Sequence, residues 1–321
     1  VGPVRIAVIG LGLIGGSLLR ALAAAGHEVI GFDADPDTRE LARAAGFEVR
    51  DSVAAAVGGT SVAALAVPLT VLPEVFGELA GYDGLVTDVT SVKGPVRVLA
   101  EEHGVRRFVG GHPMAGTEAS GFAAADAGLF DGCVWVLCVE PHGTDLGDWL
   151  ALAGLCTAMG ARVLPITAVE HDNAVASISH VPHLLAAALA WKVSGSPLNA
   201  ALAAGSFRDG TRVAATRAEL TAAMCGGNAN EVLRELTHVI SDLERLRDEL
   251  EQDDPVRALV PYLRGAGRAR RAWPPAPGVP GRLARPSARQ LLELGRTGGW
   301  VTSVGDGELR VMRPETDRYG S

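Results

Sequence analysis

Short apolar runs alternate with alanine- and leucine-rich segments along the first half of the chain. Each run is bounded by Gly, Asp or Pro, which is typical of strands that are buried on both faces. The runs interpreted as strands are Val4–Ile9, Glu28–Phe32, Val62–Val67, Leu85–Asp88, Phe108–Gly110 and Val134–Val139. Helical patterns between them include Ser17–Ala25 and Thr38–Ala45. This alternation predicts right-handed βαβ units and an α/β fold with a doubly wound parallel sheet.

The pattern becomes helical near residue 165. Thr167-Ala-Val-Glu170 has the form of a capping box and predicts a long helix from Val169 to about Val193. Further helices are expected at Leu198–Ala204, Ala218–Cys225 and Asn230–Glu251. The last one carries an apolar stripe with helical period. We therefore expect an all-α second domain whose apolar stripes also bury a partner subunit, as in a homodimer.

The C-terminal part of the chain differs from the rest in amino-acid composition. Residues Arg264–Arg289 are rich in Arg, Pro and Gly and contain no acidic residue. We interpret them as a solvated linker, with a phosphate- or nucleic-acid-binding arm as the alternative. A helix around Ala288–Leu294 and a hairpin at the Gly305-Asp306-Gly307 turn are expected to follow. The predicted domains are residues 1–165, 166–262 and 263–321, the last being a linker with a small α/β appendage.

Composition narrows the class of protein. A chain of 321 residues with 48% hydrophobic residues is long enough for two domains. The net charge of -8 argues against a whole-chain role on nucleic acid or anionic membrane. The four cysteines show neither a CxxC pair nor metal-ligand spacing, which favours buried thiols in a reducing cytosol and no metal site. No signal peptide is visible, and the alanine-rich stretches fall short of a membrane span, so we expect a soluble, cytoplasmic protein.

A glycine-rich turn follows the first predicted strand and opens a helix. It reads Gly10-Leu11-Gly12-Leu13-Ile14-Gly15. These glycines permit a tight turn, close approach of a pyrophosphate and close helix–strand packing. Asp33 ends the second strand, where a carboxylate accepts hydrogen bonds from a ribose and repels the extra phosphate of NADP. We therefore predict NAD as the cofactor, with FAD or NADP as the alternative. Val67, at the end of a later strand, either contacts the adenosine side or simply ends the strand.

Two further segments place reactive side chains at the carboxyl edge of the sheet, where open α/β folds bind ligands. Ser91 and Lys93 follow one strand, and His112 follows paired glycines at the end of another. An imidazole suits proton acceptance near neutral pH. From spacing alone, His112 is as well explained by a structural role, and Ser91 also suits a helix N-cap. Lys93 either caps the site electrostatically or is solvated.

These segments and three later ones resemble the ordered motifs of the prephenate/arogenate dehydrogenase family. The motif residues are Asp88-x-x-Ser91-Val-Lys93, Gly111-His112-Pro-Met-Ala-Gly116-Thr-Glu118, His171-Asp172, Ser179-His180-Val-Pro-His183 and Phe207-Arg208-Asp209-x-Thr211-Arg212. With the glycine motif they span residues 5 to about 250. The resemblance implies a Rossmann domain joined to a helical dimerisation domain. It also implies NAD-dependent oxidative decarboxylation of prephenate to 4-hydroxyphenylpyruvate in tyrosine biosynthesis.

The resemblance also implies roles for single residues. His112 would accept the proton of the substrate hydroxyl, and Ser91 would hydrogen-bond the imidazole or that hydroxyl. Arg212 would grip a substrate carboxylate, and His183 would contact the substrate. His180 lies on nearly the same helical face as His183 and is a further substrate candidate. Glu118 would gate the pocket or pair with an arginine.

Some features keep alternatives open. Many relatives carry a proline and a tryptophan where this chain has Ala218 and Thr221, which puts an aromatic lid in doubt. No pattern of an ACT regulatory domain is seen, so feedback through such a domain is not expected. Arogenate is the competing substrate, and Asp172 and Glu118 are the candidate acids for its ammonium group. A 3-hydroxyacid dehydrogenase or imine reductase would need a catalytic lysine, for which Lys192 is the one candidate. An NAD-binding regulator that contacts nucleic acid through the Arg-rich arm is the non-enzyme alternative.

Overall fold

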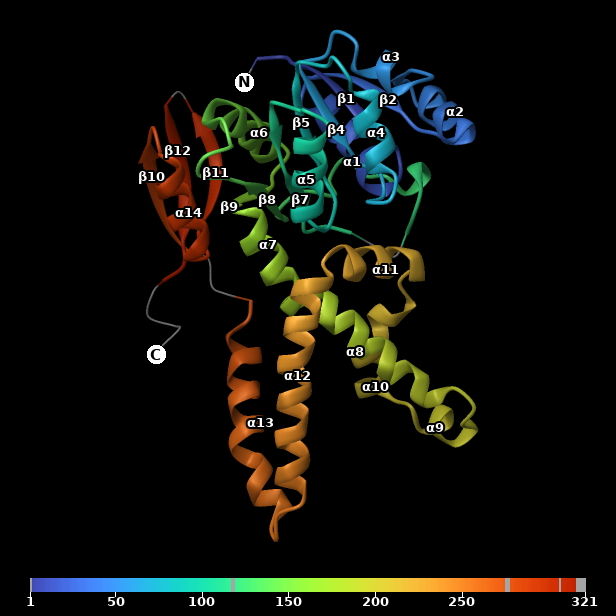
Figure 1. Cartoon of the computed structure of the whole chain (residues 1–321), viewed down its shortest axis with the longest axis vertical. Coiled ribbons are helices and arrows are strands. Elements are labelled where there is room, and N and C mark those ends of the chain that lie inside the picture. The colour runs from blue at the N-terminus through green and yellow to red at the C-terminus, as the bar shows by residue number, and fades with distance from the viewer. Residues whose placement is uncertain (1, 117–118, 275–277, 306, 316–321) are drawn as a thin grey trace.

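The computed structural model describes residues 2–116, 119–274, 278–305 and 307–315 (Figure 1). Its first unit is a six-stranded sheet in the order β3-β2-β1-β4-β5-β6, with parallel pairing throughout. This is the strand order of a Rossmann fold. The strands are β1 (Arg5–Ile9), β2 (Glu28–Phe32), β3 (Glu48–Val49), β4 (Val62–Leu65), β5 (Leu85–Asp88) and β6 (Phe108–Val109). The helices are α1 (Leu13–Ala24), α2 (Pro36–Ala44), α3 (Val53–Val57), α4 (Leu72–Glu78) and α5 (Gly94–Glu102).

A second six-stranded sheet has the order β10-β12-β11-β9-β8-β7. It contains β7 (Gly111–Pro113), β8 (Val134–Cys138) and β9 (Arg162–Ile166), with the short 3-10 helix η1 (Phe122–Ala124) before β8 and α6 (Leu146–Ala158) after it. Strand β8 pairs with β7 in antiparallel fashion and with β9 in parallel. The expectation that Val134–Val139 extends the parallel sheet was therefore wrong. Strand β7 has only three residues, too few for a periodic signal, so its antiparallel pairing left no trace in the sequence.

The C-terminal segment completes this second sheet. It consists of β10 (Val279–Ala284), α14 (Ala288–Arg296), β11 (Trp300–Gly305) and β12 (Glu308–Arg313). The predicted helix and the antiparallel pairing of the predicted hairpin are confirmed, while Asp306 of its turn lies outside the described residues. Strand β11 pairs with β9 through Val301 and Val163. Leu291 and Val301 belong to the same buried cluster as Leu19 of α1, so this small unit shares the apolar core of the first domain.

The remaining helices form a separate layer below the sheets. They are α7 (Ala168–Val175), η2 (Ala176–His180), α8 (Val181–Ala190), η3 (Trp191–Val193), α9 (Pro197–Leu202), α10 (Gly205–Thr211), η4 (Arg212–Ala215), α11 (Ala218–Gly227), α12 (Ala229–Leu250) and α13 (Pro255–Ala272). The capping box at Thr167 and Glu170 is present as predicted. In Figure 1, α8 and the α12–α13 hairpin project away from the sheets in different directions.

Two expectations for this layer need correction. Helix α13 runs to Ala272, through the first part of the segment interpreted as a linker. Apart from two glycines, residues 264–272 are all alanine and arginine, which are good helix formers, but their high positive charge was interpreted as that of a solvated linker. The 26-residue helix Ala168–Val193 is long and apolar enough to cross a membrane by length and composition alone, contrary to the expectation. In this structure 28% of its apolar window is buried, and the helix carries the buried polar residues His171, Asp172 and His180.

Candidate active site

A cavity of about 730 Å³ lies between the first sheet and the helical layer. Its volume is in the range of small-molecule sites. Seven predicted residues from the first sheet and its loops line it: Gly10, Gly12, Leu13, Ile14, Asp33, Val67 and Ser91. His112 lines the same cavity. The predicted cofactor loop and the predicted proton acceptor therefore face one space.

The glycine turn is shaped for close backbone packing. Gly10 has a φ of 94°, in the left-handed region that favours glycine. A Cβ on Gly15 would overlap the carbonyl oxygen of Gly10, so Gly15 packs against the turn and does not line the cavity. A Cβ on Gly12, in contrast, would meet no atom within 4 Å, so Gly12 borders open space at the start of α1. The backbone N–H groups of this helix start are therefore accessible to an anionic group.

Asp33 is held against this turn by backbone donors. Its Oδ2 accepts from the Leu11 N–H at 2.7 Å, and its Oδ1 accepts from the Asp35 N–H at 2.9 Å. Each carboxylate oxygen has a further lone pair for a hydroxyl donor. This geometry suits a ribose bound beside the glycine turn.

Lys93 is buried with a side-chain exposure of 0% and is not solvated, contrary to one of its two interpretations. Its Nζ donates to Asp88 and to the carbonyl oxygen of Gly111, the latter at 2.6 Å. Asp88 also accepts from the Gly111 N–H at 3.1 Å. This ion pair therefore ties the end of β5 to the residue before His112 and holds β7 in place.

His112 lies in β7, opposite Val136 of β8. Its Nδ1 is 2.8 Å from Nε2 of His171 in α7, and the two rings meet edge to face. Burial, followed by the neighbouring His171, lowers the pKa of His112 well below its usual value of 6.5. His112 is consequently neutral at neutral pH, the state that a proton acceptor requires.

The contact from His112 continues into the helical layer. His171 Nδ1 lies 2.7 Å from Oδ1 of Asp172, and both residues are buried. Asp172 also accepts from the backbone N–H groups of Lys93 at 2.8 Å and Gly94 at 2.7 Å. The sequence motifs gave His171 no site role. The contact of His171 with His112 joins residues 59 positions apart, and that of Asp172 with Lys93 joins residues 79 positions apart. No local sequence pattern predicts such contacts.

The other predicted substrate residues are spread over the helical layer. His180 is fully buried in the π-helical turn η2; its Nδ1 is 3.2 Å from Asn228 Nδ2, and its Nε2 has no partner among the described residues. Burial lowers the pKa of His180 to about 4, with His171 the next cause. His183 Nδ1 is 2.9 Å from the Ser179 carbonyl oxygen, and Arg212 lies in η4 beside α8. Neither His183 nor Arg212 lines the cavity, and Glu118 lies outside the described residues.

Arg217 and Met224 from the helical layer do line the cavity and were missed. Arg217 is exposed between η4 and α11 and lies 3.9 Å from Glu219, too far for a strong pair. A single arginine at a helix start carries no sequence signal that separates it from other surface arginines. It is nevertheless the cation that the helical layer brings to the mouth of the cavity, among the residues that the structure describes.

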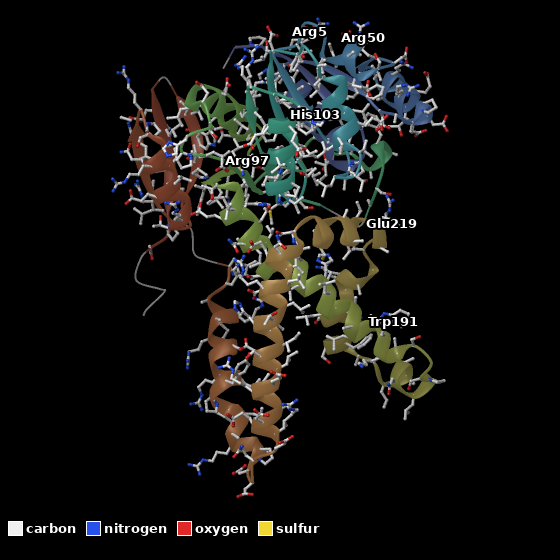
Figure 2. The ribbon with its side chains drawn as sticks, viewed as in Figure 1. Arg5, Arg50, Arg97, His103, Trp191 and Glu219 are labelled. Atoms are coloured by element: carbon white, nitrogen blue, oxygen red, sulfur yellow. The ribbon has the colours of Figure 1, made fainter. Side chains whose placement is uncertain are left out.

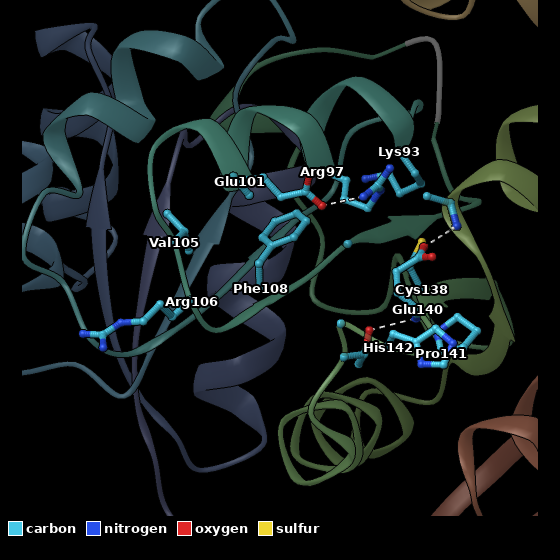
Figure 3. A pocket seen from close by; sticks show the side chains of 15 residues that line it. Lys93, Arg97, Glu101, Val105, Arg106, Phe108, Cys138, Glu140, Pro141 and His142 are labelled. Atoms are coloured by element: carbon cyan, nitrogen blue, oxygen red, sulfur yellow. Dashed lines mark hydrogen bonds and ion pairs between the residues drawn. The ribbon is translucent and has the colours of Figure 1, made fainter.

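A second cavity, of about 390 Å³, is lined by α5, β6 and the segment after β8 (Figure 3). Most of its charged lining residues already have partners in the protein. Arg97 pairs with Glu101, and Glu140 accepts from the Ala168 N–H at 2.8 Å. None of the predicted site residues that the structure describes lines it, apart from the buried Lys93. The 730 Å³ cavity is therefore the candidate active site.

The fold and the cavity define a two-domain dinucleotide-binding protein with a histidine at the ligand edge. Residues 18–164 match the family model for the nucleotide-binding domain of prephenate dehydrogenase, and residues 167–264 match the model for its dimerization domain. The chain belongs to the prephenate dehydrogenase family.

Individual relatives agree with this assignment. The chain is 36% identical to a prephenate dehydrogenase of Lactococcus lactis over 65% of this chain and 61% of that protein, so it spans about three fifths of that relative. It is 34% identical to a cyclohexadienyl dehydrogenase of Zymomonas mobilis over 78% of this chain and 89% of that one. A structure of Aquifex aeolicus prephenate dehydrogenase with hydroxyphenyl propionate and NAD+ superposes with a TM-score of 0.78 at 26% identity, covering 84% and 98% of the two chains.

Proposed function

We propose that this chain is an NAD-dependent enzyme that converts prephenate to 4-hydroxyphenylpyruvate, in the cytoplasm, as a step of tyrosine biosynthesis. The observation that carries the proposal is that His112 and the Gly10–Gly15 turn meet at one cavity. The Aquifex relative, whose structure holds NAD+ and an aromatic propionate, supports both ligand classes.

The chain's own residues account for the proton transfer from the substrate hydroxyl. NAD supplies the hydride acceptor for the hydrogen on the ring carbon that bears the hydroxyl. Neutral His112 accepts the proton of that hydroxyl, and Ser91 at the same cavity orients the donor. Loss of the ring carboxylate as CO2 then makes the ring aromatic, so the step is effectively irreversible.

The two substrate carboxylates need cationic or donor partners. We propose Arg212, His183 and His180 in this role, and Glu118 as a gate of the pocket or partner of an arginine, by their place in the family motifs. Arg217 is a further candidate because it already lines the cavity. His180 does not line the cavity, but its buried Nε2 has no partner among the described residues, which supports a donor role.

Prephenate is favoured over arogenate by the surroundings of Asp172. An acid that faces the ammonium group of arogenate must have free lone pairs in the cavity. Asp172 is buried, accepts from two backbone N–H groups and contacts His171, and it does not line the cavity. Of the two acids that the sequence suggests for the ammonium group of arogenate, Asp172 therefore already has protein partners on both carboxylate oxygens.

The decisive experiment offers prephenate and arogenate, each with NAD or NADP, to the purified full chain and follows the reduced cofactor. We expect turnover of prephenate with NAD and a lower kcat/KM for arogenate. Turnover of neither substrate would refute the proposal, and a preference for arogenate would replace the substrate.

Asp33→Asn is expected to weaken the preference for NAD over NADP by about 10-fold, measured as the ratio of the two kcat/KM values. The amide still accepts from the Leu11 N–H but no longer repels the 2′-phosphate. Asp35→Asn changes the same charge at an exposed helix N-cap and serves as the control. An unchanged cofactor ratio in Asp33→Asn would remove Asp33 from the cofactor argument.

We propose that the chain is a homodimer through its helical domain. Large apolar side chains are exposed there, among them Trp191, which is 74% exposed, together with Ile240 and Leu243 on α12. Figure 2 labels Trp191 near the end of the arm that contains α8. Ile240 and Leu243 are three residues apart on one helix and so share a face, and an exposed apolar helix face is typical of an interface.

Leu243→Asp is expected to raise the dimer dissociation constant about 100-fold, because a carboxylate would be buried without a partner. His238→Asp, on another side of α12, adds the same group and is the control. Light scattering against the chain mass of 33.2 kDa measures both. A wild-type chain that is monomeric at micromolar concentration would contradict the dimer.

A further inference from the structure

His112, His171 and Asp172 form a continuous line of hydrogen-bonding side chains from the cavity into α7. The distances are 2.8 Å between the two imidazoles and 2.7 Å between His171 and Asp172. His171 is 1% exposed and Asp172 is 6% exposed, so water does not compete for these contacts. The line also crosses from the second sheet to the helical layer, and its partners therefore come from both domains.

The contacts determine where each proton lies. Asp172 takes the backbone N–H groups of Lys93 and Gly94, one on each carboxylate oxygen. With these donors and His171 around it, the pKa of Asp172 is lowered even though burial acts to raise it. Asp172 is thus an acceptor only, and His171 must donate to it from Nδ1.

The contact with His171 also determines which nitrogen of His112 carries a proton. Burial lowers the pKa of His171, against the opposing influence of Asp172, so His171 is neutral and its Nε2 carries a lone pair. That lone pair accepts a hydrogen bond from Nδ1–H of His112. His112 must then carry its own lone pair on Nε2, which leaves this nitrogen as the one that can take a proton from a ligand in the cavity.

We propose that His171 and Asp172 are positioning residues that hold His112 in the Nδ1–H tautomer and share the charge that it gains. The proposal rests on the proposed function. In the proton-transfer step, the substrate hydroxyl loses its proton to Nε2 of His112. The Nδ1 proton of His112 passes to Nε2 of His171, and the resulting imidazolium is paired with the Asp172 carboxylate. No further proton donor or acceptor is needed.

The other charged groups around this line do not reverse that assignment. The Lys93 ammonium is paired with the buried Asp88, and its charge lowers the pKa of both imidazoles, in the same direction as burial. His180, on η2, is neutral because its pKa is about 4, and its Nδ1 faces the Asn228 amide. Asp172 is therefore the unneutralised carboxylate beside His171 among the described residues.

Two substitutions of His171 separate positioning from mere packing. His171→Gln places an amide oxygen where Nε2 was, so it still accepts from His112 but takes no proton. His171→Leu removes the acceptor. We expect kcat to fall about 10-fold for glutamine and about 100-fold or more for leucine, with KM for the substrate and Kd for NAD nearly unchanged. Val175→Ala, buried on the same helix, is the control for packing loss and should leave kcat unchanged.

The protonation states are tested without substrate by neutron diffraction on the deuterated full chain at neutral pH. Deuterium is expected on Nδ1 of His112 and of His171, and on neither Nε2. Deuterium on Nε2 of His112, or equal kcat values for His171→Gln and His171→Leu, would overturn the proposal. If the protons lie as expected but prephenate is not oxidised, the proposed role of His171 and Asp172 in fixing the His112 tautomer stands and the proposed function fails.

Discussion

Replacing His112 with asparagine is expected to lower kcat about 10³-fold, within the range that general acid–base catalysis contributes. The amide is smaller than the imidazole and can still donate to His171, but it cannot accept a proton. The cofactor loop is untouched, so Kd for NAD should stay within about twofold of the wild-type value. Stopped-flow measurement of cofactor reduction at saturating substrate gives kcat, and fluorescence quenching gives Kd.

His103→Asn is the matched control for this substitution. His103 is an exposed histidine at the end of α5, and its Nδ1 faces the Leu99 carbonyl oxygen at 2.9 Å. It should keep wild-type kcat. If His112→Asn retains more than about a tenth of the wild-type kcat, His112 is not the proton acceptor.

The pH profile gives an independent check on the same residue. The pKa of His112 is lowered below 6.5 by burial, so the base stays neutral and active at pH values where an exposed histidine is already half protonated. Activity is therefore present above the lowered pKa and lost as the pH falls through it. The acid limb of kcat/KM should lie below pH 6.5 in the wild type and be absent in His112→Asn.

The features that were predictable from the sequence all lie within short stretches of chain. The parallel sheet was predictable because each strand is a short apolar run bounded by Gly, Asp or Pro. The Gly10–Gly15 turn was predictable because all of its chemistry lies within six consecutive residues. His112 and Ser91 were expected at the ligand edge because each comes three residues after a strand of the parallel sheet, β6 and β5, although the structure places His112 in a further strand, β7.

What the sequence could not supply depends on contacts between distant segments. His171 reaches His112 only because α7 is docked against β7, and Asp172 anchors that docking through the backbone of Lys93 and Gly94. Arg217 reaches the cavity only through the turn between η4 and α11. In the same way, the C-terminal unit joins the second sheet through the pairing of β11 with β9, which no periodicity predicts.

Two glycines of the cofactor turn should differ in how the same added methyl group changes the free energy of unfolding. Gly15→Ala is expected to lower the free energy of unfolding by about 3 kcal/mol, because its Cβ would overlap the backbone of Gly10 and contact Ala66. Neither neighbour is a flexible side chain, so α1 must shift away from β1. Urea denaturation measures the loss, and NAD binding is expected to fall with it.

Gly12→Ala is the control for protein packing, since a Cβ at Gly12 meets no protein atom within 4 Å and the φ of -66° is allowed for alanine. Its stability should match the wild type within about 0.5 kcal/mol, the usual range for a surface substitution. The methyl group instead occupies the space beside the helix start, where a pyrophosphate would approach the backbone, so Kd for NAD should rise about 100-fold. A stable Gly12→Ala protein that binds NAD normally would place the pyrophosphate elsewhere, whereas a destabilised one would mean that the turn itself cannot accept a side chain. Because the two substitutions add the same atom within one turn, their contrast separates the glycine required by the fold from the glycine required by the ligand.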